Sequence, residues 1–169
     1  IGSPLSWFEQ VCLCSFVAQG HTVNLFTYSD IGTIPDGVIV RNGREVIDTD
    51  VFIKYKNKDS YALFADWFRM RMVERFPGII WMDIDTYCYR PVTLTDEYVF
   101  GNFNGNPHVA NGVFSAPSNS ELLQNILDFM EDQFPSPPWL SKKARDRFAV
   151  AREAGNPIHI SEMPWGTWG

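Results

Sequence analysis

The chain has 169 residues, a formal net charge of −6 and 45% hydrophobic residues. This apolar content is enough to fill a sizeable core, so we expect a folded protein and not a disordered one. An acidic chain without a basic stripe lacks the electrostatic footprint of a nucleic-acid-binding protein. Its apolar runs are shorter than the roughly 20 residues that a membrane-spanning helix needs, so no transmembrane segment is expected.

The three cysteines, Cys12, Cys14 and Cys88, favour a reducing compartment. Their number is odd, and Cys12 and Cys14 lie in an apolar helical stretch, which supports neither a disulfide framework nor a zinc knuckle. No charged-then-apolar secretory leader is expected. We therefore predict a cytoplasmic protein and leave open a peripheral association with a membrane. Because the sequence starts at Ile1 and not at Met, and ends on Trp165-Gly166-Thr167-Trp168-Gly169, truncation at both ends is also expected.

Helical and strand patterns alternate along the first half of the chain. Apolar residues at helical spacing predict helices, and alternating or continuous apolar runs predict strands. In chain order we expect a helix over 5–18 that Ser3 and Pro4 start, strands over 22–28 and 38–40, a helix over 61–76 and a strand over 79–82. This alternation favours an α/β fold: one Rossmann-like domain over residues 1–169 with a mixed, mainly parallel sheet flanked by helices.

The second half of the chain is expected to add two strands and two helices. The strands fall at 98–103 and 109–115 around the polar turn 104–107, and the helices at 121–133 and 142–154. Ser118, Asn119 and Ser120 supply the cap of the first helix. The second helix is charged and has little apolar face, so residues 142–169 are predicted to form a peripheral helix and tail.

Two acidic residues, Asp83 and Asp85, follow the predicted strand at 79–82. The continuous apolar run of that strand is typical of a parallel sheet covered on both faces, and open α/β sheets bind ligands beyond the carboxyl ends of their strands. Residues two apart on a strand face the same side, with Cα atoms about 6 to 7 Å apart, so the two carboxylates should point together.

The repulsion between these carboxylates is about 3 kcal/mol at about 6 Å and an effective dielectric near 20, and a divalent cation would reverse it. Mg²⁺ or Mn²⁺ is the predicted cofactor, because both prefer oxygen ligands. Two solvated acids that open a loop are the alternative interpretation.

The predicted helix at 61–76 carries a second polar pair, Asp66 and Arg69. A helical wheel places Arg71, Glu74 and Arg75 on a solvated or partner-facing edge, and places Asp66 and Arg69 on the opposite side, toward the expected sheet. Desolvating two ions costs several kcal/mol, so a functional role explains the position better than a stabilising one. An ordinary ion pair at the sheet edge is the alternative.

These motifs together resemble a known family. The stretch FADWFRMRMVERFPGIIWMDIDTYCYRP, the segment Ile1–Ser6 with Glu9, and the block Asn111–Pro117 are similar to the DXD-containing sugar transferases of the GT-A type, the bacterial and fungal family with capsule and α-1,4-glycosyl transferases. The resemblance covers most of the chain. It departs from the usual pattern where Ala65 stands for serine and Pro77-Gly78 for a double glycine, and the family's first strand, which helps to hold the nucleotide base, is absent.

The resemblance implies a metal-dependent retaining hexosyltransferase of polysaccharide biosynthesis. It would move a sugar from a nucleotide diphosphosugar, a UDP-sugar in preference to a GDP-sugar, to a hydroxyl of a carbohydrate or another acceptor. By resemblance Asp85 binds the metal, while Asp83 contacts the ribose and shares the metal through water. Asp66 would accept hydrogen bonds from sugar hydroxyls, and Arg69 would donate hydrogen bonds from its guanidinium N–H groups to the sugar or the phosphate.

Two further residues enter through the resemblance. Asn111 would line the sugar or acceptor pocket, and a turn asparagine that bonds its own backbone is the alternative. His159 would be an extra nitrogen ligand of the metal, and a structural histidine is the alternative.

Two other function classes stay open at this point. The first is a sugar-nucleotide binding module without turnover. The second is an aspartyl-phosphate phosphatase, in which the first Asp of the D-x-D motif is the nucleophile. Tyr87, at a position where that class carries Thr or Val, and the lack of a later paired-acid loop count against the phosphatase.

Overall fold

The computed structural model describes residues 3–93, 97–102, 109–164 and 166–167. The chain divides into two compact units, each built from two stretches of sequence. The first unit consists of Ile1–Thr49 and Ile79–Ser115, and the second of Asp50–Gly78 and Ala116–Gly169. The prediction of a single domain over 1–169 stays a prediction.

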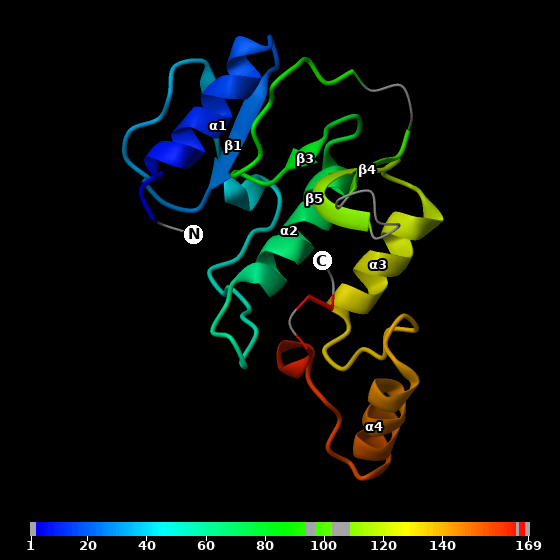
Figure 1. Ribbon diagram of the computed structural model, residues 1–169. Coiled ribbons are helices and arrows are strands. Elements are labelled where there is room, and N and C mark those ends of the chain that lie inside the picture. The colour runs from blue at the N-terminus through cyan, green and yellow to red at the C-terminus, as the bar shows by residue number, and fades with distance from the viewer. Residues whose placement is uncertain (1–2, 94–96, 103–108, 165, 168–169) are drawn as a thin grey trace. The chain divides into compact units, whose positions relative to one another are not determined.

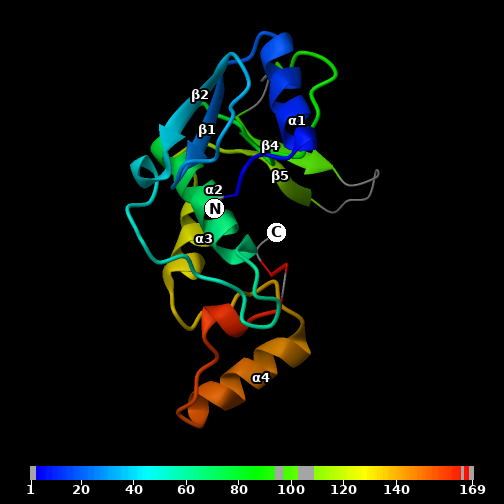
Figure 2. The ribbon, with the colours of Figure 1, turned by 90° about the vertical axis from the view of Figure 1, so that its left-hand side faces the viewer.

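A helix and a two-stranded parallel sheet open the first unit. Helix α1 (Trp7–Ala18) contacts strands β1 (Val23–Thr27) and β2 (Val38–Asn42), which pair in parallel and lie side by side (Figure 2). Ser6 caps the helix, in place of the expected Ser3 and Pro4. Ser6 Oγ accepts a hydrogen bond from the Glu9 amide, and Glu9 Oε2 accepts one from the Ser6 amide, so the two residues form a capping box.

The second sheet of this unit is antiparallel and has the strand order β3-β5-β4. It contains β3 (Trp81–Met82), β4 (Val99–Asn102) and β5 (Val109–Ser115). The register shifts between Phe100 and Gly101, where a Cβ on Gly101 would lie 2.7 Å from the Ala110 carbonyl oxygen. Only a glycine allows the two strands to approach so closely.

The mixed α/β class is confirmed, whereas a mainly parallel sheet is not. Among the described residues, parallel pairing is limited to β1 and β2. The prediction of a parallel strand covered on both faces at 79–82 is wrong, because β3 pairs antiparallel with β5 and is only half-buried. A short apolar run does not reveal the direction of its partner strand. The predicted turn at 104–107 lies outside the described residues, as does Phe103.

The second unit is helical in its described part. Helix α2 (Ala62–Arg75) packs against α3 (Glu121–Glu131), as Figure 1 shows, and α4 (Lys142–Glu153) and the 3-10 turn η2 (Ile160–Glu162) follow. Ser120 caps α3 as expected, by accepting a hydrogen bond from the Leu123 amide. Buried side chains of both helices form the core of this unit, among them Leu63, Phe64, Val73, Leu123, Leu127 and Met130. Among the described residues, no helix has the length and apolar character needed to cross a bilayer.

Adjacent leucines on α3 test this packing. Leu123 is fully buried, whereas Leu122 is 41% exposed. Leu123→Ala should lower the free energy of unfolding by about 2 to 5 kcal/mol, because it removes buried contacts and leaves a cavity. Leu122→Ala is the matched control and should change it by no more than about 0.5 kcal/mol. Denaturant titrations of both variants measure the difference, and equal losses would contradict the orientation of α3.

Candidate functional site

The D-x-D motif lies where β3 ends. The Asp83 amide still donates a hydrogen bond to the Gly112 carbonyl, at 2.7 Å, which continues the pairing of β3 with β5. Beyond this bond the chain turns, and the Thr86 amide donates to the Asp83 carbonyl at 2.9 Å. Asp83 is therefore the first residue of a tight turn at the carboxyl end of β3, a position that Asp commonly takes.

The turn corrects the expected geometry of the two acids. Asp85 is the third residue of this turn and not the next same-side residue of a strand. The period-two argument for two parallel carboxylates therefore does not hold. Asp83 is half-buried and Asp85 is exposed, so the two carboxylates have different surroundings.

Neighbouring strand residues hold the Asp83 carboxylate. Trp81 Nε1 donates a hydrogen bond to Asp83 Oδ1 at 2.7 Å. Asp83 Oδ2 lies against Gly112, since a Cβ on that glycine would be only 2.9 Å from it. Asn111, the other sequence candidate in this unit, precedes Gly112 on β5. The structure thus brings Asp83 next to the Asn111-Gly112 segment.

Helix α1 anchors the segment that follows the turn. The Cys88 amide donates a hydrogen bond to Ser15 Oγ at 2.8 Å, and the Ser15 hydroxyl donates to the Cys12 carbonyl at 2.6 Å. Burial raises the pKa of the Cys12 thiol, and the negative charges of Asp85 and Glu9 raise it further. Asp85 is therefore within electrostatic reach of α1. The loop that carries the D-x-D motif is held between β5 and this helix.

The second unit contains the other polar pair. Asp66 and Arg69 are 7% and 5% exposed, and Arg69 Nη1 lies 3.5 Å from Asp66 Oδ1. Tyr55 is fully buried nearby: burial raises the pKa of its hydroxyl, and the negative charge of Asp66 raises it further. The sequence correctly placed Asp66 and Arg69 on the buried side of α2. A buried ion pair costs desolvation energy, which calls for a reason beyond stability.

The opposite edge of α2 contacts α3. Arg71 forms ion pairs with Glu74 on its own helix, at 2.5 Å, and with Glu131 on α3. Arg71 and Glu74 therefore face α3, whereas Arg75, the third residue of that edge, is exposed.

His159 caps the short turn η2. Its Nδ1 accepts a hydrogen bond from the Ser161 amide at 3.2 Å and lies 2.7 Å from Ser161 Oγ, so this ring nitrogen is engaged within the turn. This arrangement favours the structural role that the sequence left as the alternative.

The carboxylates of Asp83 and Asp85 are the hard oxygen ligands that Mg²⁺ and Mn²⁺ prefer. Within the described ranges, no group of three His, Cys, Asp or Glu side chains could hold a metal ion. Two carboxylates fit a metal that takes its remaining ligands from phosphate oxygens and water. They do not fit a closed site made by the protein alone.

Sequence reasoning missed three residues that shape this site. Three contacts orient the D-x-D loop. The Trp81 indole donates to Asp83, Gly112 lies against the Asp83 carboxylate, and the Ser15 hydroxyl accepts a hydrogen bond from the Cys88 amide. Trp81 stands two residues before Asp83, so a same-side contact could have been predicted from strand periodicity. Ser15 is 73 residues from Cys88, and the sequence gives no signal for that contact.

Comparisons with protein-family models, with curated proteins and with solved structures found no match to this chain.

The buried pair on α2 gives a stability test. Arg69→Met alone should lower the free energy of unfolding by about 3 kcal/mol, because it leaves the Asp66 carboxylate buried without its ion-pair partner. Adding Asp66→Ala should recover much of that loss, since the double variant buries no charge. Denaturant titrations of the two single variants and the double variant complete the cycle. Additive losses would show that the two side chains are energetically independent.

Proposed function

We propose that this protein is a cytoplasmic, metal-dependent retaining glycosyltransferase with a GT-A type fold. It would transfer a hexose from a nucleotide diphosphosugar, most naturally a UDP-sugar, to a hydroxyl of a carbohydrate or another acceptor. The observation that carries the proposal is the two-acid turn at the end of β3, where Asp83 is oriented by Trp81 and Gly112 and Asp85 is exposed. Placing acids beyond the carboxyl end of a strand is typical of ligand sites in α/β proteins.

Asp85 and Asp83 would hold Mg²⁺ or Mn²⁺ together with the diphosphate of the donor. When bound, the metal supplies Lewis-acid stabilisation of the negative charge on the leaving diphosphate. Asp85 is the first choice as direct ligand because it is exposed. The half-buried Asp83 accepts a hydrogen bond from Trp81 on one oxygen, so it is better suited to contact the ribose and to bind the metal through water.

The remaining residues would recognise the donor sugar. Asp66 accepts hydrogen bonds from sugar hydroxyls, and Arg69 donates to the sugar or the phosphate. Asn111 would line the sugar or acceptor pocket; it directly precedes Gly112, the glycine that lies against the Asp83 carboxylate. The buried ion pair of Asp66 and Arg69 supports this role, since a carboxylate and a guanidinium together offer acceptors and donors of fixed orientation.

A sugar-nucleotide binding module without turnover is the second candidate. It is favoured by the small number of protein ligands in the D-x-D turn, because a metal held mostly by phosphate can bind without being placed for catalysis. Metal-dependent hydrolysis of the donor separates the two functions, since a binding module would not release free sugar.

Metal and nucleotide should bind together. Mn²⁺ alone is expected to bind weakly, whereas UDP should bind at least about 10-fold more tightly with Mn²⁺ than with EDTA, because its phosphate oxygens complete the coordination shell. Isothermal titration calorimetry of UDP and GDP, each with Mn²⁺ and with EDTA, measures this coupling. Nucleotide affinities that do not respond to chelation would contradict the metal site.

Asp85 is expected to be needed for turnover and not for folding. Asp85→Asn should lower the transfer rate by at least about 100-fold, since it removes a charged ligand from the site of charge development. Its free energy of unfolding should change by less than about 0.5 kcal/mol, because Asp85 is exposed.

Asp36→Asn is the matched control for Asp85→Asn. It makes the same change of charge at an exposed turn residue of the same unit. Donor-hydrolysis and transfer assays should find full activity in this variant. An active Asp85→Asn protein, or a strongly destabilised one, would remove Asp85 from the catalytic site.

A further inference from the structure

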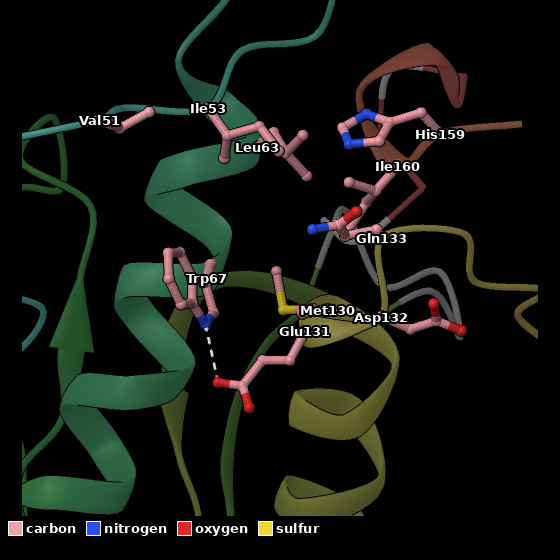
Figure 3. Close-up of a pocket in the computed structure, with 10 residues that line it drawn as sticks. All are labelled: Val51, Ile53, Leu63, Trp67, Met130, Glu131, Asp132, Gln133, His159 and Ile160. Atoms are coloured by element: carbon pink, nitrogen blue, oxygen red, sulfur yellow. Dashed lines mark hydrogen bonds between the residues drawn. The ribbon is translucent and has the colours of Figure 1, made fainter. Parts of the chain in front are cut away.

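The second unit contains a cavity of about 450 Å³ that the proposed donor site does not use. Its size falls in the range of small-molecule sites in proteins. Three parts of the unit line it: the start and middle of α2 with the segment before it, the end of α3, and the residues around η2 (Figure 3). The lining residues are Val51, Ile53, Leu63, Trp67, Met130, Glu131, Asp132, Gln133, His159 and Ile160.

Aliphatic side chains and the Trp67 indole form most of the cavity wall. The deeper part is fixed by the core of the unit, because Leu63, Met130 and Ile160 are each less than a tenth exposed. Trp67 packs edge-on against Phe64, with ring centroids 6.0 Å apart, and its Nε1 donates to Glu131 Oε1 at 3.3 Å. The indole is therefore held in place on one side of the cavity (Figure 3).

The two acidic residues of the lining are already engaged within the protein. The Glu131 carboxylate accepts the Trp67 hydrogen bond and forms an ion pair with Arg71. Asp132 Oδ1 accepts a hydrogen bond from the Phe134 amide at 2.8 Å, and its side chain points away from the cavity in Figure 3. The lining thus offers little charge to a ligand, which disfavours an ionic ligand.

The polar groups that line the cavity besides the two acids are the Gln133 amide and the His159 imidazole. Figure 3 shows the Gln133 amide pointing between Trp67 and His159. The backbone of Gln133 is fixed, because its carbonyl accepts a hydrogen bond from the Ile160 amide at 2.9 Å. His159 Nδ1 accepts a hydrogen bond from the Ser161 amide, and its ring lines the cavity. A ligand therefore meets an amide that donates and accepts, an imidazole that can hydrogen-bond, and an apolar wall with one aromatic side chain.

We propose that this cavity binds a neutral carbohydrate, with a sugar ring packed on Trp67 and its hydroxyls bonded to Gln133 and His159. A pyranose has an apolar face of C–H groups and a rim of hydroxyls, and this matches the lining. A purely apolar ligand would leave the amide and the imidazole without partners, which lowers affinity. The assignment of this sugar as the acceptor of the transfer reaction rests on the proposed function, whereas the binding of a carbohydrate does not.

Fluorine NMR of the full chain labelled with 5-fluorotryptophan tests the proposal. The chain has six Trp residues, and Trp67→Phe identifies the Trp67 resonance by its loss. The probes are methyl α-glucoside, methyl α-galactoside and methyl α-mannoside, with cyclohexanol and uridine for comparison. A saturable shift of the Trp67 resonance with at least one glycoside is expected. Shifts with cyclohexanol or uridine but with no glycoside would overturn the proposal.

Gln133→Ala should weaken glycoside binding by about 3- to 10-fold, the effect of one lost hydrogen bond. Asn125→Ala is the control, because Asn125 is an exposed amide on α3 that does not line the cavity. It should leave the affinity unchanged. Equal affinities in the two variants would remove Gln133 from the binding site and overturn the proposed contact.

Transfer assays separate this proposal from the proposed function. If the protein binds glycosides at Trp67 but hydrolyses and transfers no donor sugar, the carbohydrate site stands and the transferase assignment fails. If it transfers sugar while no glycoside shifts Trp67 and Gln133→Ala leaves the acceptor KM unchanged, the transferase stands and this cavity is not its acceptor site.

Discussion

The hydrogen bond from the Asp83 amide to the Gly112 carbonyl is the contact on which the candidate donor site depends. It continues the pairing of β3 with β5 by one hydrogen bond, and the chain turns directly after it. The same approach of backbones places the Asp83 carboxylate against Gly112, where a Cβ would lie only 2.9 Å from Asp83 Oδ2. The indole of Trp81 then fixes one carboxylate oxygen. A backbone pairing thus decides the orientation of an acid, and the turn that follows exposes the next one.

The two units differ in how far their charged candidate residues are exposed to solvent. In the first unit, the acids of the D-x-D turn are half-buried and exposed, so water can solvate Asp85 until a cation arrives. In the second unit, Asp66 and Arg69 are both buried and their charges balance each other. Such a pair adds little net stability, because desolvation offsets the attraction. It does keep a carboxylate and a guanidinium in one orientation, which a recognition site needs.

Local patterns were sufficient to predict most elements of the fold. Helices α1, α2, α3 and α4 and strands β1, β2, β4 and β5 lie within a few residues of the expected bounds, because apolar periodicity and caps act over a few residues. The position of Asp83 at a strand end and the burial of Asp66 and Arg69 were predicted for the same reason. Local patterns did not predict the partner strand of β3, the turn that contains Asp85 or the capping of α1 by Ser6.

The sequence by itself determined which residues carry charge, which faces of the helices are apolar and where the chain can turn, since these are properties of neighbouring residues. Only the tertiary structure decided that β3 pairs antiparallel with β5, that Ser15 holds Cys88 across 73 residues, and that Gln133 and His159 point into one cavity with Trp67. Such contacts join segments far apart in the chain, and their free energy comes from burial and hydrogen bonding that exist only once the chain is folded.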